Sequence, residues 1–168
     1  MDADFLLIHK MKNGDEEAIE VFVKKYYSTI RNYCRLHTYT DCDAEDITQA
    51  TFEHFFRSFR SYHHLGKTAN YLYVIARNLC RDSYKKKRDI VMEALPDKGE
   101  NPIAENKIDI EESIKKLPED LQEVVILHYF QDLKLKEVAD IIGIGLPLVK
   151  YRIGKAKELL SVYLGDKK

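Results

Sequence analysis

The chain has 168 residues, of which 45% are hydrophobic and 33% are charged, the balance of a folded globular protein rather than a disordered one. No apolar run approaches the roughly 20 residues that a membrane-spanning helix needs, and the acidic start lacks the layout of a signal peptide. The three cysteines, Cys34, Cys42 and Cys80, show neither a disulfide framework nor a zinc-ligand spacing. We therefore expect a cytoplasmic protein.

Charge is distributed unevenly along the chain although the formal net charge is only −1. Residues 57–88 hold nine Lys or Arg against one Asp, and residues 133–168 hold eight basic against four acidic residues. Residues 1–56 and 89–132 are acidic. Because charges are screened beyond about 8–10 Å at physiological salt, each basic block can attract a polyanion separately. The pattern predicts two nucleic-acid-binding surfaces.

The first half of the chain is predicted to be helical. Apolar residues at helical spacing predict one helix over residues 15–37 and another that continues to about residue 60, capped by Asp41 or Asp43. A short helix is expected before them, over residues 3–12, ending at Asn13-Gly14. A loop at 61–66 and a long helix at 68–88 complete this part.

The second half begins after an interruption. Pro96, Gly99 and Pro102 break an acidic stretch, and periodicity resumes near Ile108. Pro118 is expected in the first turn of the next helix, followed by helices at 134–142 and 146–164. The sequence thus predicts an all-α fold: a helical domain at 1–88, a flexible acidic linker at 89–107, and a second helical domain at 108–168.

The last two predicted helices have helix-turn-helix features. Ala139 allows close helix crossing, Gly143 can adopt the left-handed conformation that ends a helix, and Pro147 suits a first turn. Val149 and Ile153 would face inward. The residues left outward on the second helix are Lys150, Tyr151, Arg152, Lys155 and Lys157. Such a helix lies in the major groove of duplex DNA; the alternative is a helical hairpin with a solvated basic face.

The helix predicted at 68–88 carries a basic face with interleaved aromatic residues. Arg77, Arg81, Lys85 and Arg88 recur at steps of four, four and three, and Tyr71, Tyr73 and Tyr84 lie among them. Cations beside exposed rings suit single-stranded DNA, whose bases stack while its phosphates meet the charges. The alternative is that the tyrosines are core residues and the basic face is solvated.

Catalytic and metal-binding patterns are weak in this sequence. His54, His63 and His64 lack carboxylate or cysteine ligands at convincing spacing, and no phosphate-binding glycine loop occurs. A helix N-terminus facing a partner explains the carboxylates of Asp41, Asp43, Glu45 and Asp46 better than an acid–base site. We expect no metal, cofactor, small-molecule substrate or enzymatic activity.

Two stretches together resemble a known family. The sequence Asp43-Ala44-Glu45-Asp46-Ile47-Thr48-Gln49-Ala50-Thr51-Phe52 with Tyr71–Leu79 resembles region 2 of the sigma-70 family, in its extracytoplasmic-function (ECF) group. The stretch from Leu117-Pro118 to Val149-Lys150-Tyr151-Arg152 resembles region 4. The similarity covers nearly the whole chain, in the family's order.

The resemblance implies a promoter-reading subunit of bacterial RNA polymerase that helps open the DNA. The clamp helices of the largest subunit would bind Asp46, Gln49 and Glu53, and region 4 would also contact the polymerase flap. The −10 element would be bound by Tyr62, His63, His64, Lys67, Tyr71, Arg77, Asn78, Arg81, Asp82 and Lys85. The −35 element would be bound by Leu146, Leu148, Lys150, Tyr151, Arg152 and Lys155. An anti-sigma factor would control the chain and could hold it at the membrane.

The sequence also departs from the family pattern. Tyr71 stands where Trp is common, Ala50 where Glu is usual, and Pro147-Leu148 where Gly-Thr is common. Two other readings remain: a stand-alone helix-turn-helix regulator with an N-terminal sensor module, and a helical hydrolase or metal enzyme. The basic, aromatic helix at 68–88 favours the polymerase subunit, because a sensor module would not need it.

Overall fold

The computed structural model describes residues 3–63, 68–91 and 105–165. Over these residues the chain is helical and contains no strand, which confirms the predicted all-α fold. It divides into two units, Met1–Tyr84 and Lys85–Lys168. Most of the linker predicted at 89–107 falls on residues 92–104, which lie outside the described residues. Within the described part, no helix combines the length and apolarity that crossing a membrane requires.

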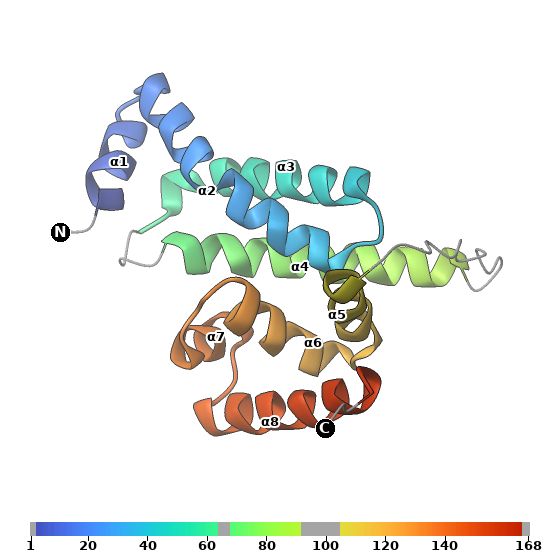
Figure 1. Ribbon diagram of the computed structural model, residues 1–168. Coiled ribbons are helices and arrows are strands. Elements are labelled where there is room, and N and C mark those ends of the chain that lie inside the picture. Colours follow the sequence, from blue (N-terminus) through green and yellow to red (C-terminus); the bar gives the residue numbers. More distant parts are fainter. Residues whose placement is uncertain (1–2, 64–67, 92–104, 166–168) are drawn as a thin grey trace. The chain divides into compact units, whose positions relative to one another are not determined.

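The described residues of the first unit form α1 (Ala3–Lys12), α2 (Glu16–His37), α3 (Asp41–Arg57) and the greater part of α4 (Thr68–Val91), whose residues from Lys85 on fall in the second unit. A 3-10 turn, η1 (Phe59–Ser61), follows α3. Figure 1 shows α2 crossing α3, and the Phe55 ring on α3 lies 5.8 Å from the Tyr71 ring on α4. The core is rich in aromatic rings because α2, α3 and α4 each contribute them: Phe22 stacks on Phe55 at 5.0 Å, and Tyr33 meets Tyr73 edge-on at 5.5 Å.

The start of α3 differs from the prediction. Thr40, rather than Asp41 or Asp43, is the N-cap, and its Oγ1 accepts a hydrogen bond of 3.0 Å from the Asp43 N–H. Asp41 and Asp43 lie instead in the first turn, where carboxylates interact favourably with the positive end of the helix dipole. The helix also ends at Arg57, earlier than predicted, because η1 takes up residues 59–61.

Two buried threonines of α3 are satisfied within their own helix. Thr48 and Thr51 donate to the carbonyls of Ala44 and Ile47, four residues earlier, at 2.7 and 2.8 Å. The thiols of Cys34 and Cys80 are both buried. A hydrogen bond from Cys80 lowers the pKa of Cys34, against the opposing effect of burial. Helices α2 and α4 are therefore joined through the interior by a polar contact as well as by apolar ones.

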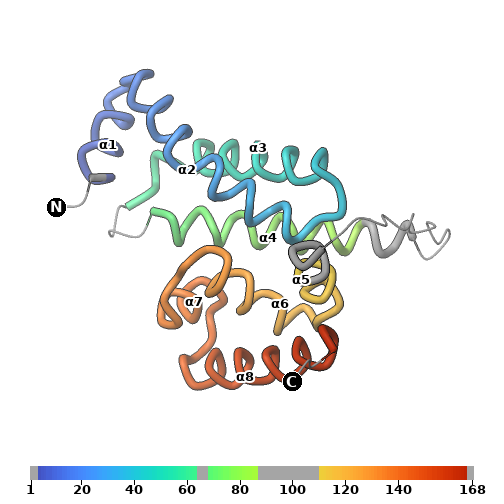
Figure 2. Tube along the Cα trace, viewed as in Figure 1, coloured from blue at the N-terminus to red at the C-terminus, as the bar shows by residue number. Residues whose placement is uncertain are grey.

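The second unit contains α5 (Glu105–Lys116), α6 (Glu119–Val125), α7 (Leu135–Ile142) and α8 (Leu146–Tyr163) within its described residues. Pro118 is the residue immediately before α6, one position earlier than predicted. A π-helical segment, η2 (Ile126–Phe130), continues α6 and was not among the predicted elements. Figure 2 traces the path from α6 through α7 into α8. The core of this unit includes Val124, Ile126, Leu127, Val138 and Val149, all fully buried.

Candidate DNA and polymerase interfaces

The helix-turn-helix predicted in the second unit is present. Gly143 ends α7 in the left-handed conformation, with φ of 81°, and its N–H bonds to the Ala139 carbonyl at 2.8 Å. Pro147 lies in the first turn of α8. Val149 and Ile153 are buried as predicted. The carboxylate of Glu137 accepts from the Lys134 N–H at 3.0 Å and so stabilises the start of α7.

The outward face of α8 carries most of the predicted −35 residues. Lys150, Tyr151 and Lys155 are exposed, Tyr151 to 66%, and Leu148 is exposed to 41%. Leu146 is half-buried at the start of the helix. Lys155 also forms a surface pair with Glu158 at 3.6 Å. The face therefore offers cations, one aromatic ring and one apolar side chain to a partner.

Arg152 is placed differently from its neighbours on α8. Its side chain is only 19% exposed, and its Nη2 lies 3.9 Å from a carboxylate oxygen of Asp120 on α6. Asp120 is 73% exposed, and an exposed ion pair at this distance contributes about 0–1 kcal/mol. A guanidinium held this weakly can be transferred to a nucleic-acid partner at small cost.

The predicted −10 residues are divided between the surface and the core of the first unit. On α4, Asn78, Asp82 and Lys85 are exposed, whereas Arg77 and Arg81 are half-buried. Tyr62 is buried at 9% exposure, and Tyr71 is half-buried beside it with ring centroids 5.1 Å apart. A base could stack on Tyr62 only after that ring leaves its cluster. Residues His64 and Lys67 lie outside the described residues.

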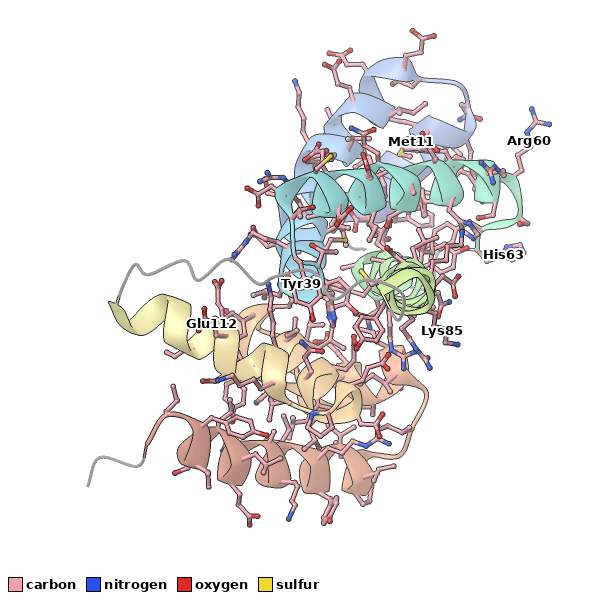
Figure 3. The ribbon with its side chains drawn as sticks, turned by 90° about the vertical axis from the view of Figure 1, so that its right-hand side faces the viewer. Met11, Tyr39, Arg60, His63, Lys85 and Glu112 are labelled. Carbon is pink, nitrogen blue, oxygen red and sulfur yellow. The ribbon has the colours of Figure 1, made fainter. Side chains whose placement is uncertain are left out.

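His63 and Arg60 extend from the segment that precedes α4. Both residues are exposed, and Figure 3 shows their side chains pointing away from the helices. The tyrosines that the sequence placed among the basic residues of α4 have opposite environments. Tyr73 is fully buried in the core, while Tyr84 is 47% exposed. Of these two tyrosines, only Tyr84 lies on the surface in this structure.

The three predicted polymerase-binding residues lie on one exposed stretch of α3. Asp46, Gln49 and Glu53 are all exposed. Gln49 and Glu53 line an open groove of about 670 Å³ between α2 and α3. The other residues that line the groove are Val23, Tyr27, Phe52, Phe56 and Arg57. The groove thus has an apolar floor with a polar edge, which is typical of a protein-docking surface.

The α2 side of this groove was not among the predicted site residues. Tyr27 stacks on Phe52 with ring centroids 5.8 Å apart, and its hydroxyl donates to Glu45. Arg31 donates to the other oxygen of Glu45 at 2.8 Å. Glu45 therefore fixes the aromatic wall of the groove. The four-residue spacing of Val23 and Tyr27 was the one available signal that they share a face.

No three His, Cys, Asp or Glu side chains in the described part of the chain are close enough together to hold a metal ion. Along the same residues, the cysteines are free thiols. The described residues present three faces: a basic helix-turn-helix, a basic helix with an exposed residue before it, and a groove between α2 and α3.

Comparisons with known proteins agree with this geometry. The model of sigma-70 region 2 matches residues 22–90, and that of sigma-70 region 4 matches residues 107–160. The region 2 match assigns the N-terminal unit to the same family as the C-terminal one, which removes the basis for a sensor module there. Members of this family are transcription initiation factors rather than enzymes.

Individual relatives match most of the chain. The ECF RNA polymerase sigma factor SigW of Bacillus subtilis is 28% identical over 178 residues, covering 95% of each chain. SigE of Mycolicibacterium smegmatis is 31% identical over 73% of this chain and 52% of its own.

Two solved structures share the fold. CnrH, in complex with the cytosolic domain of CnrY, has a TM-score of 0.80 at 22% identity, covering 99% of this chain and 100% of its own. RpoE of Bartonella quintana, in complex with the anti-sigma factor NepR, has a TM-score of 0.74 at 17% identity, covering 89% and 98%. The chain belongs to the sigma-70 family of RNA polymerase sigma factors, in its extracytoplasmic-function group.

Proposed function

We propose that this sigma factor works in the cytoplasm and divides promoter recognition between its two units. The N-terminal unit docks on core polymerase and captures the melted −10 strand, and the C-terminal unit binds the −35 element as duplex. The observation that carries this proposal is the presence, in one chain, of a helix-turn-helix with an outward basic face and a separate basic helix preceded by an exposed loop residue, His63.

The −35 element is bound by α8. Leu146, Leu148, Lys150, Tyr151, Arg152 and Lys155 lie on this helix, at or near its N-terminal half. Arg152 reads a guanine edge after leaving Asp120, because a guanidinium can make two hydrogen bonds to that base. Lys150 and Lys155 neutralise phosphates, and Leu148 supplies apolar contact in place of a hydroxyl.

The −10 strand is bound along α4 and the segment before it. Arg77, Asn78, Arg81, Asp82 and Lys85 form the track on the helix, and Tyr62, His63, His64, Lys67 and Tyr71 belong to the preceding segment and the helix start. His63 is exposed and Tyr71 half-buried, so bases can reach these rings at the edge of the unit. Positive charge on Arg81 and Lys85 attracts the phosphates between them.

Core polymerase docks at the groove between α2 and α3. The clamp helices of the largest subunit contact Asp46, Gln49 and Glu53, and apolar partner side chains enter above Phe52 and Phe56. Acidic residues at the edge of an apolar groove favour a partner with basic residues around an apolar centre. The flap of the polymerase binds the C-terminal unit.

An anti-sigma factor inhibits the chain by covering these surfaces. Both solved structures with high TM-scores are complexes, one with an anti-sigma factor and one with a cytosolic domain of a second protein. An inhibitor must block either the docking groove or the basic faces, since all are needed for initiation. A membrane-bound inhibitor would also hold the chain at the membrane.

The division of labour is tested with core polymerase, the full chain and fork-junction promoter DNA. Arg152→Ala should weaken the −35 contribution by roughly 1–3 kcal/mol and relax preference at one base pair, while −10 strand binding stays unchanged. Arg81→Ala should weaken −10 strand binding and leave the −35 contribution unchanged. Lys136→Ala and Lys24→Ala remove one charge from each unit outside the proposed faces and serve as controls. If each variant weakens both elements equally, the proposed division is wrong.

A further inference from the structure

The segment that leads into α4 is anchored by a residue from the other end of the first unit. Lys12, the last residue of α1, donates from its Nζ to the main-chain carbonyl of Tyr62 at 2.6 Å. The same ammonium lies 5.9 Å from the centre of the Phe59 ring. Fifty residues separate the two partners in sequence, so this contact is a tertiary clamp rather than a local turn.

The helix that carries Lys12 is bonded to and packed against α2. Asp4, which is only 8% exposed, accepts hydrogen bonds from Lys25, at 2.6 Å, and from the hydroxyl of Tyr26, both on α2. Ile8 and Met11 bury the inner face of α1 at 3% exposure each. Helix α1 is thus joined to α2 at its first turn and along its length, and Lys12 projects from a fixed end.

The clamped segment is fixed at its other contacts too. The Tyr62 ring packs against Phe55 and Tyr71, with centroids 5.4 and 5.1 Å away. Its hydroxyl donates to Thr68 Oγ1, the first residue of α4, at 3.3 Å. The backbone at Tyr62 is therefore held from one side by Lys12 and its side chain from the other by α4, while the next residue, His63, stays exposed.

We propose that Lys12 is a positioning residue for −10 recognition: it fixes the backbone at Tyr62 so that His63 and the start of α4 are presented to the DNA strand in one geometry. This inference rests on the proposed −10 function of the segment. A single charged hydrogen bond is enough to affect recognition, because small displacements of a recognition group lower the affinity for DNA and weaken the discrimination between bases. Lys12 itself need not touch DNA.

The test compares Lys12→Met, Lys12→Arg and Lys10→Met in holoenzyme assembled from core polymerase and the full chain. Methionine keeps the apolar reach of the side chain without the ammonium. Lys10 is exposed on the same helix, two residues away and therefore on another face, so Lys10→Met removes the same charge from a different place. The readouts are affinity for labelled single-stranded −10 oligonucleotides, the change in that affinity at each single-base substitution, and the unfolding temperature of each chain.

We expect Lys12→Met to weaken −10 strand binding by about tenfold, because the released backbone at Tyr62 must then be ordered when the strand binds, and to flatten the base preferences. Lys12→Arg should restore both properties, and Lys10→Met should leave the preferences unchanged. Equal behaviour of Lys12→Met and Lys10→Met would overturn the inference. A loss that follows a lowered unfolding temperature, without flattened preferences or rescue by Arg, would also overturn it. If the unsubstituted chain binds no −10 strand, the proposed function of this unit fails instead.

Discussion

Two glycines in the helix-turn-helix should respond to alanine in opposite directions. Gly143 ends α7 with φ of 81°, and a methyl group there would meet no atom within 4 Å. Gly154 lies inside α8, and a methyl group there would also meet nothing within 4 Å. Since neither site is crowded, the difference between them comes only from backbone conformation.

The size of each change in folding stability follows from that difference in backbone conformation. An alanine in the left-handed region costs roughly 1–2 kcal/mol, so Gly143→Ala should destabilise the second unit by about that amount. In a helix interior alanine is favoured over glycine by about 1 kcal/mol, so Gly154→Ala should stabilise α8. Asparagine tolerates the left-handed region better, and Gly143→Asn should therefore cost less than Gly143→Ala.

Urea unfolding followed by circular dichroism measures the overall change. Hydrogen exchange of the α7 and α8 amides assigns that change to the second unit. Exchange in α2 and α3 serves as an internal control and should not change. If Gly143→Ala and Gly154→Ala shift stability in the same direction, the left-handed turn between α7 and α8 is not present as described.

Three further outcomes follow from the surfaces. Asp120→Asn should raise the affinity for −35 duplex by about two- to fivefold, because Arg152 no longer has to break a surface ion pair worth up to about 1 kcal/mol of binding free energy. An unchanged or lower affinity in a band-shift titration would show that the pair does not compete with DNA. Glu53→Lys should slow association with core polymerase by roughly tenfold at low salt and less at high salt, and Glu17→Lys should not, as biosensor kinetics can check. Iodoacetamide should label exposed Cys42 before the two buried cysteines, and mass spectrometry showing equal labelling would contradict the described core.

The regular helices could be predicted because their information is local. Apolar spacing defines the buried faces of α2 and α4, and Gly143 and Pro147 mark the turn of the helix-turn-helix by their backbone preferences. The cap of α3 was harder, since Thr40, Asp41 and Asp43 all suit an N-cap and only the fold selects one. The π-helical continuation of α6 has no comparable local signature.

The binding surfaces could be predicted only in part, for a related reason. The exposure of charged residues on a helix face, such as Lys150, could be predicted because burying an unpaired charge costs too much free energy. Tyrosine suits both a core and a base-stacking surface, so the sequence could not separate Tyr73, which is buried, from Tyr84, which is exposed. The groove that Tyr27 shares with Glu53 depends on how α2 crosses α3, and its α2 wall could not be derived from either helix alone.

Selection of promoters by transcription tests the central claim most directly. Core polymerase with the full chain would transcribe a template library randomised separately at the −10 and −35 positions, and the transcribed templates would be sequenced. We expect enrichment at both elements in the same molecules. Arg152→Ala should change only the −35 preference, and Lys12→Met should flatten only the −10 preference. Enrichment at a single element, or no transcription that depends on the chain, would contradict the proposed division of promoter recognition.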